Sequence, residues 1–388
     1  MATKKDTFCL APWYSIHLNS RGYLSPCCKF QDQKKKYKYN EIENYFTSPE
    51  LEKVRQDLLQ GVRNYHCTKC WDDEDKGGDS LRQITNRTIA LHNKINLKEQ
   101  LNYPKTSSVR SFDLTLGNLC NLKCIMCSPQ YSSQLLAEAN TNPALKSLYD
   151  QEYNQKEFDW PNGDDFVDWC NQYLQYTTHI KFTGGEPFII PWIKEVIERM
   201  PDSQKEKCVL HFTSNLTVID QKLFKCFEKF KEVWLSVSVE GTHDTHEYLR
   251  HGHTWQKLTD NLKIVQDMAM HNLRLKINHV VQAPSFHSIM DMTNFFDSVG
   301  LEIHPVMLYR PKHFHISALT RRSKEKFLAD TEYYVGLNKE FIKFVRNATQ
   351  ENVEQDKELN SDCIKHLDKL DRTRKNNHKN IIPIDNLY

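Results

Sequence analysis

Short stretches of alternating apolar and polar residues, separated by helical patterns, run through the middle of this 388-residue chain. Alternation with a period of two is typical of half-buried strands, whereas apolar residues three and four positions apart mark one face of a helix. The helical spacing predicts helices over residues 222–230 and 255–268. The alternating pattern predicts strands over residues 108–116, 179–183, 208–213, 233–239, 273–281 and 301–308.

This succession of strands and helices predicts an α/β fold, in which six βα units over residues 108–316 form a partial (β/α)6, TIM-like barrel. Because crossover connections are right-handed, the loops that follow the strands are expected at the carboxyl edge of the sheet, where α/β folds bind ligands. Outside the barrel we expect a cysteine-rich module over residues 1–71, a polar and partly helical connector over 72–107 and a helical extension over 317–388.

Composition and charge exclude several classes of protein. Twelve cysteines are too few for a disulfide-built secreted scaffold, and 39% hydrophobic with 26% charged residues is a globular composition. The 52 basic and 50 acidic residues nearly cancel, so nucleic acid and membranes are not expected partners. The chain has no run of 18 apolar residues and no signal-peptide pattern, so we expect a cytoplasmic protein whose clustered cysteines bind metal or take part in catalysis.

Three cysteines follow the first predicted strand closely. Cys120, Cys124 and Cys127 have the spacing C-x3-C-x2-C. Cysteine thiolates hold iron–sulfur clusters, and a structural tetrahedral site normally uses four ligands. The triplet therefore predicts a cluster with one iron open to an external ligand. A zinc site completed by a distant histidine and a chance triplet are the alternatives.

A pair of glycines ends the second predicted strand. Gly184 and Gly185 are followed by Glu186 and Pro187, in a chain with only 12 glycines. Glycine lets the backbone approach a ligand closely, and backbone carbonyls with the Glu186 carboxylate can accept hydrogen bonds from an ammonium group. The segment is therefore a predicted ligand-binding site, with a tight turn before a helix as the alternative.

The two motifs together resemble those of the radical S-adenosylmethionine (SAM) superfamily. CNLKCIMC is similar to its CxxxCxxC cluster loop and FTGGEP to its GGEP motif, and the resemblance covers residues 108–316. It implies that Cys120, Cys124 and Cys127 hold a [4Fe-4S] cluster whose open iron binds SAM, and that residues 184–187 receive the SAM amine. It also implies reductive cleavage of SAM to a 5′-deoxyadenosyl radical, which abstracts a hydrogen atom from the substrate.

Further segments resemble the family less closely. FTSNL, at residues 212–216, is similar to its third-strand TNG motif, and SVSVEG, at 236–241, with His246 and Arg250 is similar to its S-x-D-G…H…R stretch, with Glu240 in place of aspartate. Ser238 and Asn278, at the tips of the fourth and fifth predicted strands, are candidate ribose or carboxylate contacts. The predicted SAM-binding residues are Gly184, Gly185, Glu186, Pro187, Asn215, Ser238, Glu240, Arg250 and Asn278.

A second set of cysteines lies before the barrel. Four separated thiolates suit a closed site, for which zinc, an iron–sulfur cluster and simple packing are the alternatives. Gly22-x4-Cys27 with a C-x2-C pair resembles the auxiliary-cluster modules called twitch and SPASM domains, which usually follow the barrel rather than precede it. The resemblance implies a fully ligated auxiliary [4Fe-4S] cluster that relays electrons. Its predicted ligands are Cys9, Cys27, Cys67 and Cys70, with Cys28 as the alternative to Cys27.

The predicted function is that of a radical SAM enzyme with two clusters, an oxidoreductase or transferase-like protein that acts on a peptide side chain or a small metabolite. Relatives with such modules include peptide maturases, sulfatase-maturing enzymes and aminoglycoside dehydrogenases. We expect a flavodoxin- or ferredoxin-type reductant. Tyr309 and Arg310 are candidate substrate contacts, and no catalytic acid or base is assigned. The alternative is a zinc-binding structural or interaction protein without redox chemistry.

Overall fold

The structure, a computed structural model, describes residues 7–75, 79–93, 109–149, 153–161 and 164–388. The start of the first predicted strand, at Ser108, and much of the predicted connector lie outside these residues. The chain divides into two compact units. Unit 1 comprises Met1–Asn118, Asn154–Phe212 and Gln221–Val233, and unit 2 comprises Leu119–Tyr153, Thr213–Asp220 and Trp234–Tyr388.

Among the described residues, eight strands form one open sheet in the order β2-β1-β3-β4-β5-β6-β7-β8. Strand β1 is parallel to β3, β3 to β4, β4 to β5 and β7 to β8, whereas the short β2 is antiparallel to β1. The predicted α/β class and parallel sheet are confirmed, and β1 and β2 add to the six predicted strands. The strands are β1 Ser15–Leu18, β2 Leu24–Ser25, β3 Ser111–Thr115, β4 His179–Thr183, β5 Val209–Ser214, β6 Glu232–Ser238, β7 Leu273–Val281 and β8 Ile303–Met307.

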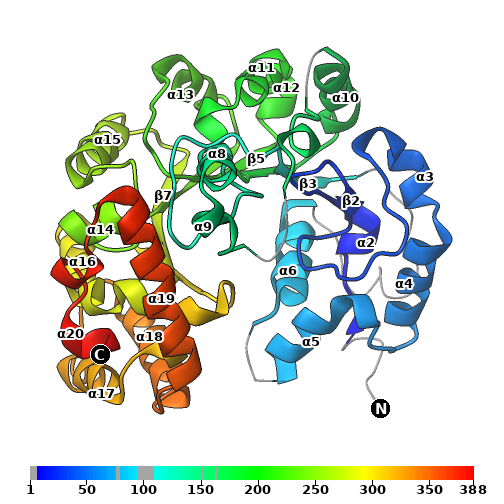
Figure 1. The fold of residues 1–388 in the computed structure, drawn as a ribbon. Helices are drawn as coiled ribbons and strands as arrows, with labels where there is room; N and C mark the ends of the chain where they lie inside the picture. The colour runs from blue at the N-terminus through cyan, green and yellow to red at the C-terminus, as the bar shows by residue number, and fades with distance from the viewer. Residues whose placement is uncertain (1–6, 76–78, 94–108, 150–152, 162–163) are drawn as a thin grey trace. The chain divides into compact units, whose positions relative to one another are not determined.

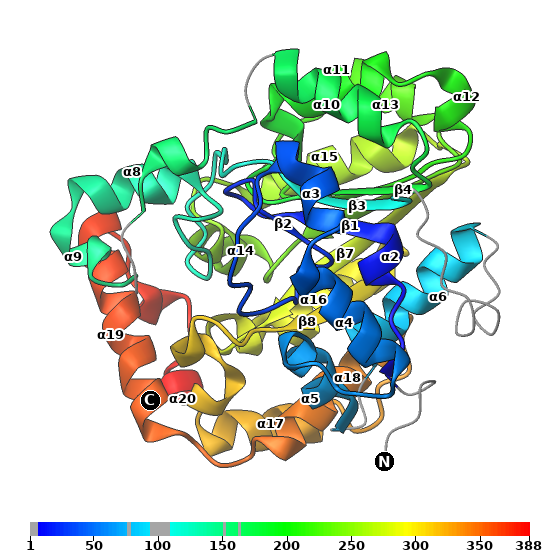
Figure 2. The ribbon, with the colours of Figure 1, turned by 90° about the vertical axis from the view of Figure 1, so that its right-hand side faces the viewer.

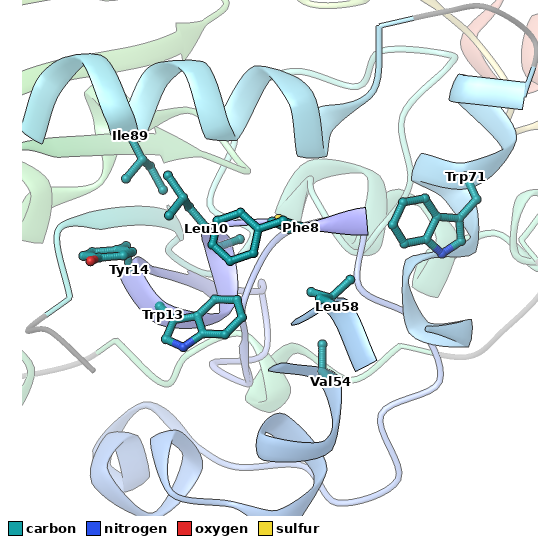
Figure 3. Packing of buried hydrophobic residues seen from close by; sticks show 10 residues of the cluster. Phe8, Leu10, Trp13, Tyr14, Val54, Leu58, Trp71 and Ile89 are labelled. Atoms are coloured by element: carbon teal, nitrogen blue, oxygen red, sulfur yellow. The ribbon is translucent and has the colours of Figure 1, made fainter. Parts of the chain in front are cut away.

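The N-terminal part of unit 1 has a core of its own, in which the first helical turn packs between later helices (Figure 3). Ser48 caps the longer helix α4 by accepting the Leu51 N–H, and Pro49 starts that helix with a fitting backbone angle. Burial of large apolar side chains stabilises this core. The buried cluster includes Phe8, Leu10, Trp13, Tyr14, Val54, Leu58, Trp71 and Ile89.

The strands of unit 1 alternate between an apolar face and a polar face. Phe112 of β3 meets Trp169 of α10 edge to face, and Phe212 of β5 packs on Phe227 of α13. The opposite face carries polar side chains because successive residues of a strand point to opposite sides. The helices of unit 1 are α2 Ala11–Tyr14, α3 Ile42–Phe46, α4 Pro49–Leu59, α5 Thr68–Asp75, α6 Leu81–Asn93, α10 Asp164–Leu174, α11 Pro191–Arg199, α12 Asp202–Lys205 and α13 Gln221–Phe227 (Figure 1).

Unit 2 ends in a helical segment, as the sequence predicts for residues 317–388. Its long helix α19 contacts α9, and Arg374 of α19 donates two hydrogen bonds to Glu138 of α8 (Figure 2). Among the described helices, none has the length and apolar character that a membrane crossing needs. The helices of unit 2 are α8 Ser133–Thr141, α9 Pro143–Lys146, α14 His243–Leu249, α15 Trp255–Asp267, α16 Ile289–Ser298, α17 Arg321–Asp330, α18 Lys339–Glu351, α19 Lys357–Arg374 and α20 Ile384–Leu387.

Candidate functional site

The three cysteines of the CNLKCIMC segment lie in one loop of unit 2, between β3 and α8. Cys120 and Cys124 are each 8% exposed, Cys127 is half-buried, and all three pack around Leu122. Burial raises the pKa of the Cys127 thiol, and the neighbouring sulfurs of Cys124 and Cys120 raise it further. The three sulfurs are therefore close enough to interact electrostatically.

Hydrogen bonds from two directions hold this cysteine loop. The backbone N–H of Lys123 donates to the carbonyl of His251 (2.9 Å), and that of Ile125 donates to the carbonyl of Leu249 (2.9 Å). From the loop after β5, the amide of Asn215 donates to Oδ1 of Asn121 (3.1 Å). Asn215, a predicted SAM contact, thus has a structural role in positioning the loop.

A buried ion pair lies beside the same loop. Glu240 is fully buried, and both of its carboxylate oxygens accept hydrogen bonds from Arg250. Nη1 of Arg250 also lies 3.8 Å from Sγ of Cys124. Burial alone would lower the pKa of Arg250, but the charges of Glu240 and Cys124 raise it above its ordinary value. The positively charged guanidinium of Arg250 therefore lies next to a predicted cluster ligand, and Glu240 offsets part of its effect on the Cys124 thiol.

The donor set of the loop fits an iron–sulfur cluster better than a single ion. Among the described residues, no group of three or more histidine, cysteine, aspartate or glutamate side chains could hold one metal ion. A four-iron cluster makes a different demand, since each thiolate binds its own iron atom. Three half-buried or buried thiols from one short loop, with the guanidinium of Arg250 at one of them, meet that demand.

The predicted SAM-amine segment follows β4 in unit 1. Gly184 and Gly185 have φ values of +76° and +49°, and a Cβ on Gly184 would lie 2.1 Å from Cγ2 of Thr115. Glycine is therefore required here by backbone conformation and by the neighbouring strand. Glu186 is 1% exposed, and its carboxylate accepts the N–H of Phe188, so it also caps the short 3-10 helix that begins at Pro187.

Two of the remaining predicted SAM contacts differ in position. Ser238 is the last residue of β6 and is buried, as expected for a strand end. Asn278 lies inside β7 rather than at its tip, because β7 continues to Val281. The Asn278 carbonyl accepts the N–H of Val239 (3.0 Å).

The four predicted ligands of the second site lie together in unit 1. Cys9 belongs to the buried N-terminal core, and Cys27 and Cys67 pack against that core. Burial raises the pKa of Cys9 to about 12, and the sulfur of Cys70 contributes to this increase. Burial also raises the pKa of Cys27, and the sulfurs of Cys28, Cys9 and Cys67 add to the effect. Core packing thus gathers cysteines that are separated in sequence.

Charged side chains that the sequence did not single out surround these four thiols. Arg82 is 7% exposed, donates to the carbonyl of Phe8 (2.7 Å) and forms two hydrogen bonds with Glu74. Its charge opposes the burial-driven increase in the pKa of Cys9. A neighbouring cation favours the thiolate, which is the form that binds metal. Arg82 was missed because it comes near the cysteines only through folding.

A row of polar side chains crosses the other face of the unit 1 strands. His17 of β1, Asp113 of β3, Lys181 of β4 and His211 of β5 are register neighbours. Oδ2 of Asp113 lies 3.6 Å from Nδ1 of His17 and 3.9 Å from Nζ of Lys181. Burial raises the pKa of Asp113, but Lys181 and His17 outweigh it and hold that pKa below its ordinary value.

This polar row contains an acid, a base and two imidazoles on one sheet face. Cys28 is exposed and interacts electrostatically with Asp113 and Lys181. The sequence pattern that could have indicated this row is one polar residue between two apolar residues in each strand. These residues are the histidine of SIHL, the aspartate of SFDLT, the lysine of HIKFT and the histidine of VLHFTS.

Comparison with known proteins identifies one family. Residues 114–292 match the family model of the Radical SAM superfamily. A comparison with curated protein sequences found no match. Similar solved structures include native anSMEcpe with bound AdoMet, at 17% identity and a TM-score of 0.37 over 57% of this chain and 58% of that chain. They also include Streptococcus suis SuiB bound to the precursor peptide SuiA, at 16% identity and a TM-score of 0.40 over 77% of this chain and 61% of that chain.

The chain thus covers less than two thirds of each of these two proteins. The family match begins within β3 and ends within α16, so it includes the cysteine loop, the segment after β4 and the Glu240–Arg250 pair. Residues 114–292, which are just under half of this chain, are therefore similar to the radical SAM superfamily.

Proposed function

We propose that the chain is a radical SAM enzyme. Cys120, Cys124 and Cys127 would hold a [4Fe-4S] cluster, and residues 184–187 would receive the amine of SAM. When bound, this cluster supplies the electron that cleaves SAM reductively and so starts hydrogen abstraction from the substrate. The observation that carries the proposal is the family match over residues 114–292, which contains three thiols gathered in one hydrogen-bonded loop.

The chain's own residues have defined tasks in this proposal. The backbone bonds of Lys123 and Ile125 and the amide of Asn215 keep the loop in one conformation, which holds the three sulfurs in place. Arg250 stabilises the thiolate of Cys124, and Glu240 orients Arg250. We also propose Ser238 and Asn278 as SAM contacts.

For the second site we propose an auxiliary [4Fe-4S] cluster bound by Cys9, Cys27, Cys67 and Cys70. Cys27 is preferred to Cys28 because its sulfur interacts with those of Cys9 and Cys67, whereas Cys28 interacts with Asp113 and Lys181. Four protein ligands would leave no iron open to substrate. The proposed role is electron transfer, which suits a reaction in which the substrate is oxidised.

The proposed substrate is a peptide side chain or a small metabolite with polar groups, and the proposed reductant is of the flavodoxin or ferredoxin type. The row of His17, Asp113 and Lys181 supports a polar substrate, because it offers hydrogen-bond donors and acceptors on a partly exposed sheet face. We place the reaction in the cytoplasm, where thiols stay reduced.

Anaerobic reconstitution followed by iron and sulfide analysis tests the proposal. We expect about eight irons per chain for two four-iron clusters, and 5′-deoxyadenosine after addition of dithionite and SAM. The triple variant Cys120→Ala, Cys124→Ala, Cys127→Ala should lose about half of the iron and all 5′-deoxyadenosine. Cys226→Ala, at a half-buried cysteine outside both sets, is the matched control and should keep both. Colourless protein that binds zinc and makes no 5′-deoxyadenosine would support the structural alternative.

A further inference from the structure

A lysine-rich loop in unit 1 carries four closely spaced positive side chains. This lysine loop, residues 32–38, is the last part of the segment between β2 and the short 3-10 helix Tyr39–Glu41. Lys34, Lys35 and Lys36 are exposed and Lys38 is half-buried. Within the described part of the chain, none of these four ammonium groups pairs with a carboxylate. The Lys38 ammonium donates instead to the backbone carbonyl of Arg21 (2.9 Å).

Two tyrosine rings lie close to three of these four ammonium groups. The Lys35 ammonium lies 4.6 Å from the centre of the buried Tyr37 ring. The ammonium groups of Lys36 and Lys38 lie 5.4 Å and 4.2 Å from the centre of the Tyr23 ring. An aromatic face attracts a cation without cancelling its charge. The loop therefore presents a localised and persistent patch of positive charge.

The carboxylates that touch the lysine loop bind its backbone. Glu50 accepts the N–H of Lys34 (3.1 Å), and Glu41 accepts the N–H of Lys38 (2.8 Å). Asp32, at the start of the loop, is exposed. These three acidic residues reduce the local excess of positive charge, but the contacts of Glu41 and Glu50 leave the side chains of Lys34, Lys35 and Lys36 exposed.

Glu50 and the two residues that precede the lysine loop connect it to His66, the neighbour of the proposed ligand Cys67. Gln31 and His66 exchange hydrogen bonds, and the rings of Phe30 and His66 stack at 4.5 Å. Oε1 of Glu50, which binds Lys34, also lies 3.5 Å from Nε2 of His66. His66 immediately precedes Cys67 in the chain. The loop is thus anchored on a residue next to a proposed cluster ligand.

Two of the four proposed ligands of the auxiliary site are more exposed than the other two. Cys9 and Cys70 are buried, whereas Cys27 and Cys67 are half-buried. The lysine loop follows Cys27 in sequence and is anchored beside Cys67 in space. We therefore take Cys27 and Cys67 as the ligands through which an electron would enter or leave the proposed cluster.

We propose that the lysine loop is the docking surface for an acidic electron-transfer protein that exchanges electrons with the auxiliary cluster. The proposal rests on the proposed function, because it requires that cluster. One electron passes between the partner's cofactor and the cluster, so that one is oxidised as the other is reduced and no covalent bond changes. Complementary charge steers such partners together and accelerates association, and a small polar interface suits a brief encounter.

Binding to an oxidised flavodoxin, a small acidic redox protein, tests the docking surface in the reconstituted holoenzyme. We expect the triple variant Lys34→Glu, Lys35→Glu, Lys36→Glu to bind flavodoxin about tenfold or more weakly than the wild type at low salt. The affinity of the corresponding triple glutamine variant should lie between those of the glutamate variant and the wild type. The matched control carries Lys326→Glu, Lys339→Glu, Lys343→Glu, which makes the same change of charge at exposed lysines of unit 2. Equal affinities for the loop variant and this control would overturn the proposal.

A second measurement examines electron transfer itself. In the Cys120→Ala, Cys124→Ala, Cys127→Ala background only the auxiliary cluster would remain, and stopped-flow absorbance follows its reduction by flavodoxin hydroquinone. The loop variant should react about tenfold more slowly than the unit 2 control at low salt, and the two rates should converge in high salt. Reduction by dithionite should be the same in both proteins.

Iron analysis separates the two levels of the proposal. A background protein without iron contradicts the auxiliary cluster itself. A protein with its iron present, whose affinity and reduction rate do not respond to the charge of the lysine loop, contradicts only the docking surface.

Discussion

Replacing Glu240 with methionine should destabilise unit 2 strongly. Glu240 is fully buried and holds the guanidinium of Arg250, which is itself 8% exposed. Removing one partner of a buried ion pair leaves the other charge without compensation, and this typically costs about 3–5 kcal/mol. Domains have unfolding free energies of about 5–15 kcal/mol, so the loss would be a large part of the total.

The reasoning is tested by a double-mutant cycle of Glu240→Met, Arg250→Met and the pair together. Because an apolar pair of similar volume avoids the unpaired charge, the double variant should be more stable than Glu240→Met alone, with a coupling energy of about 2 kcal/mol or more. Equilibrium unfolding in guanidinium chloride, followed by circular dichroism, gives the three differences. Hydrogen exchange over residues 119–153 reports whether the cysteine loop loosens as well.

Two outcomes would refute this account. If Glu240→Met lowers the free energy of unfolding by less than about 1 kcal/mol, the Glu240 carboxylate does not compensate the buried charge of Arg250. If the two single losses simply add, the side chains do not act as a pair and their hydrogen bonds contribute little.

Three further predictions concern other parts of the chain. Gly184→Ala should lower the melting temperature more than Gly300→Ala, because both glycines have positive φ but only a Cβ at Gly184 meets a neighbouring side chain. Burial lowers the pKa of His287 to about 4, so the unfolded chain binds the proton more readily than the folded chain. Stability should therefore fall as the pH drops from about 6.5 to about 4. In the His287→Gln variant, the midpoint of urea unfolding should change less with pH across this range. Cys27→Ala should remove the auxiliary iron and Cys28→Ala should retain it, as iron analysis will show.

The strands could be predicted from the sequence wherever alternation was long enough to be distinctive. Residues 179–183 and 273–281 were predicted as strands and form β4 and β7 with the same bounds. Strand β1 has only the four residues SIHL, and such a short segment has little periodicity. Its parallel pairing with β3 joins residues about a hundred positions apart, which no local pattern indicates.

In the candidate site too, features set by neighbouring residues could be predicted from the sequence, whereas contacts between distant residues could not. The spacing of Cys120, Cys124 and Cys127 is local, so the triplet could be identified before its loop was seen. Folding brings Glu240 to Arg250 and Arg82 to Cys9. From the sequence alone, Glu240 and Arg250 are predicted as SAM contacts, and Arg82 has no predicted role. Asn278 was expected at a strand tip although the predicted strand itself continued to residue 281.

The two cysteine sites share one electrostatic arrangement, although they belong to different units and different motifs. Each has a buried arginine near its sulfurs, and a glutamate binds that arginine: Glu240 binds Arg250 near Cys124, and Glu74 binds Arg82 near Cys9. Burial makes a thiol harder to ionise, and a nearby cation offsets part of this effect, as Arg250 does for Cys124 and Arg82 does for Cys9. A free arginine would move toward solvent, whereas the glutamate fixes its direction and satisfies its remaining donors. The same pair of residue types therefore recurs beside both cysteine sets, whereas burial alone raises the pKa of Cys170.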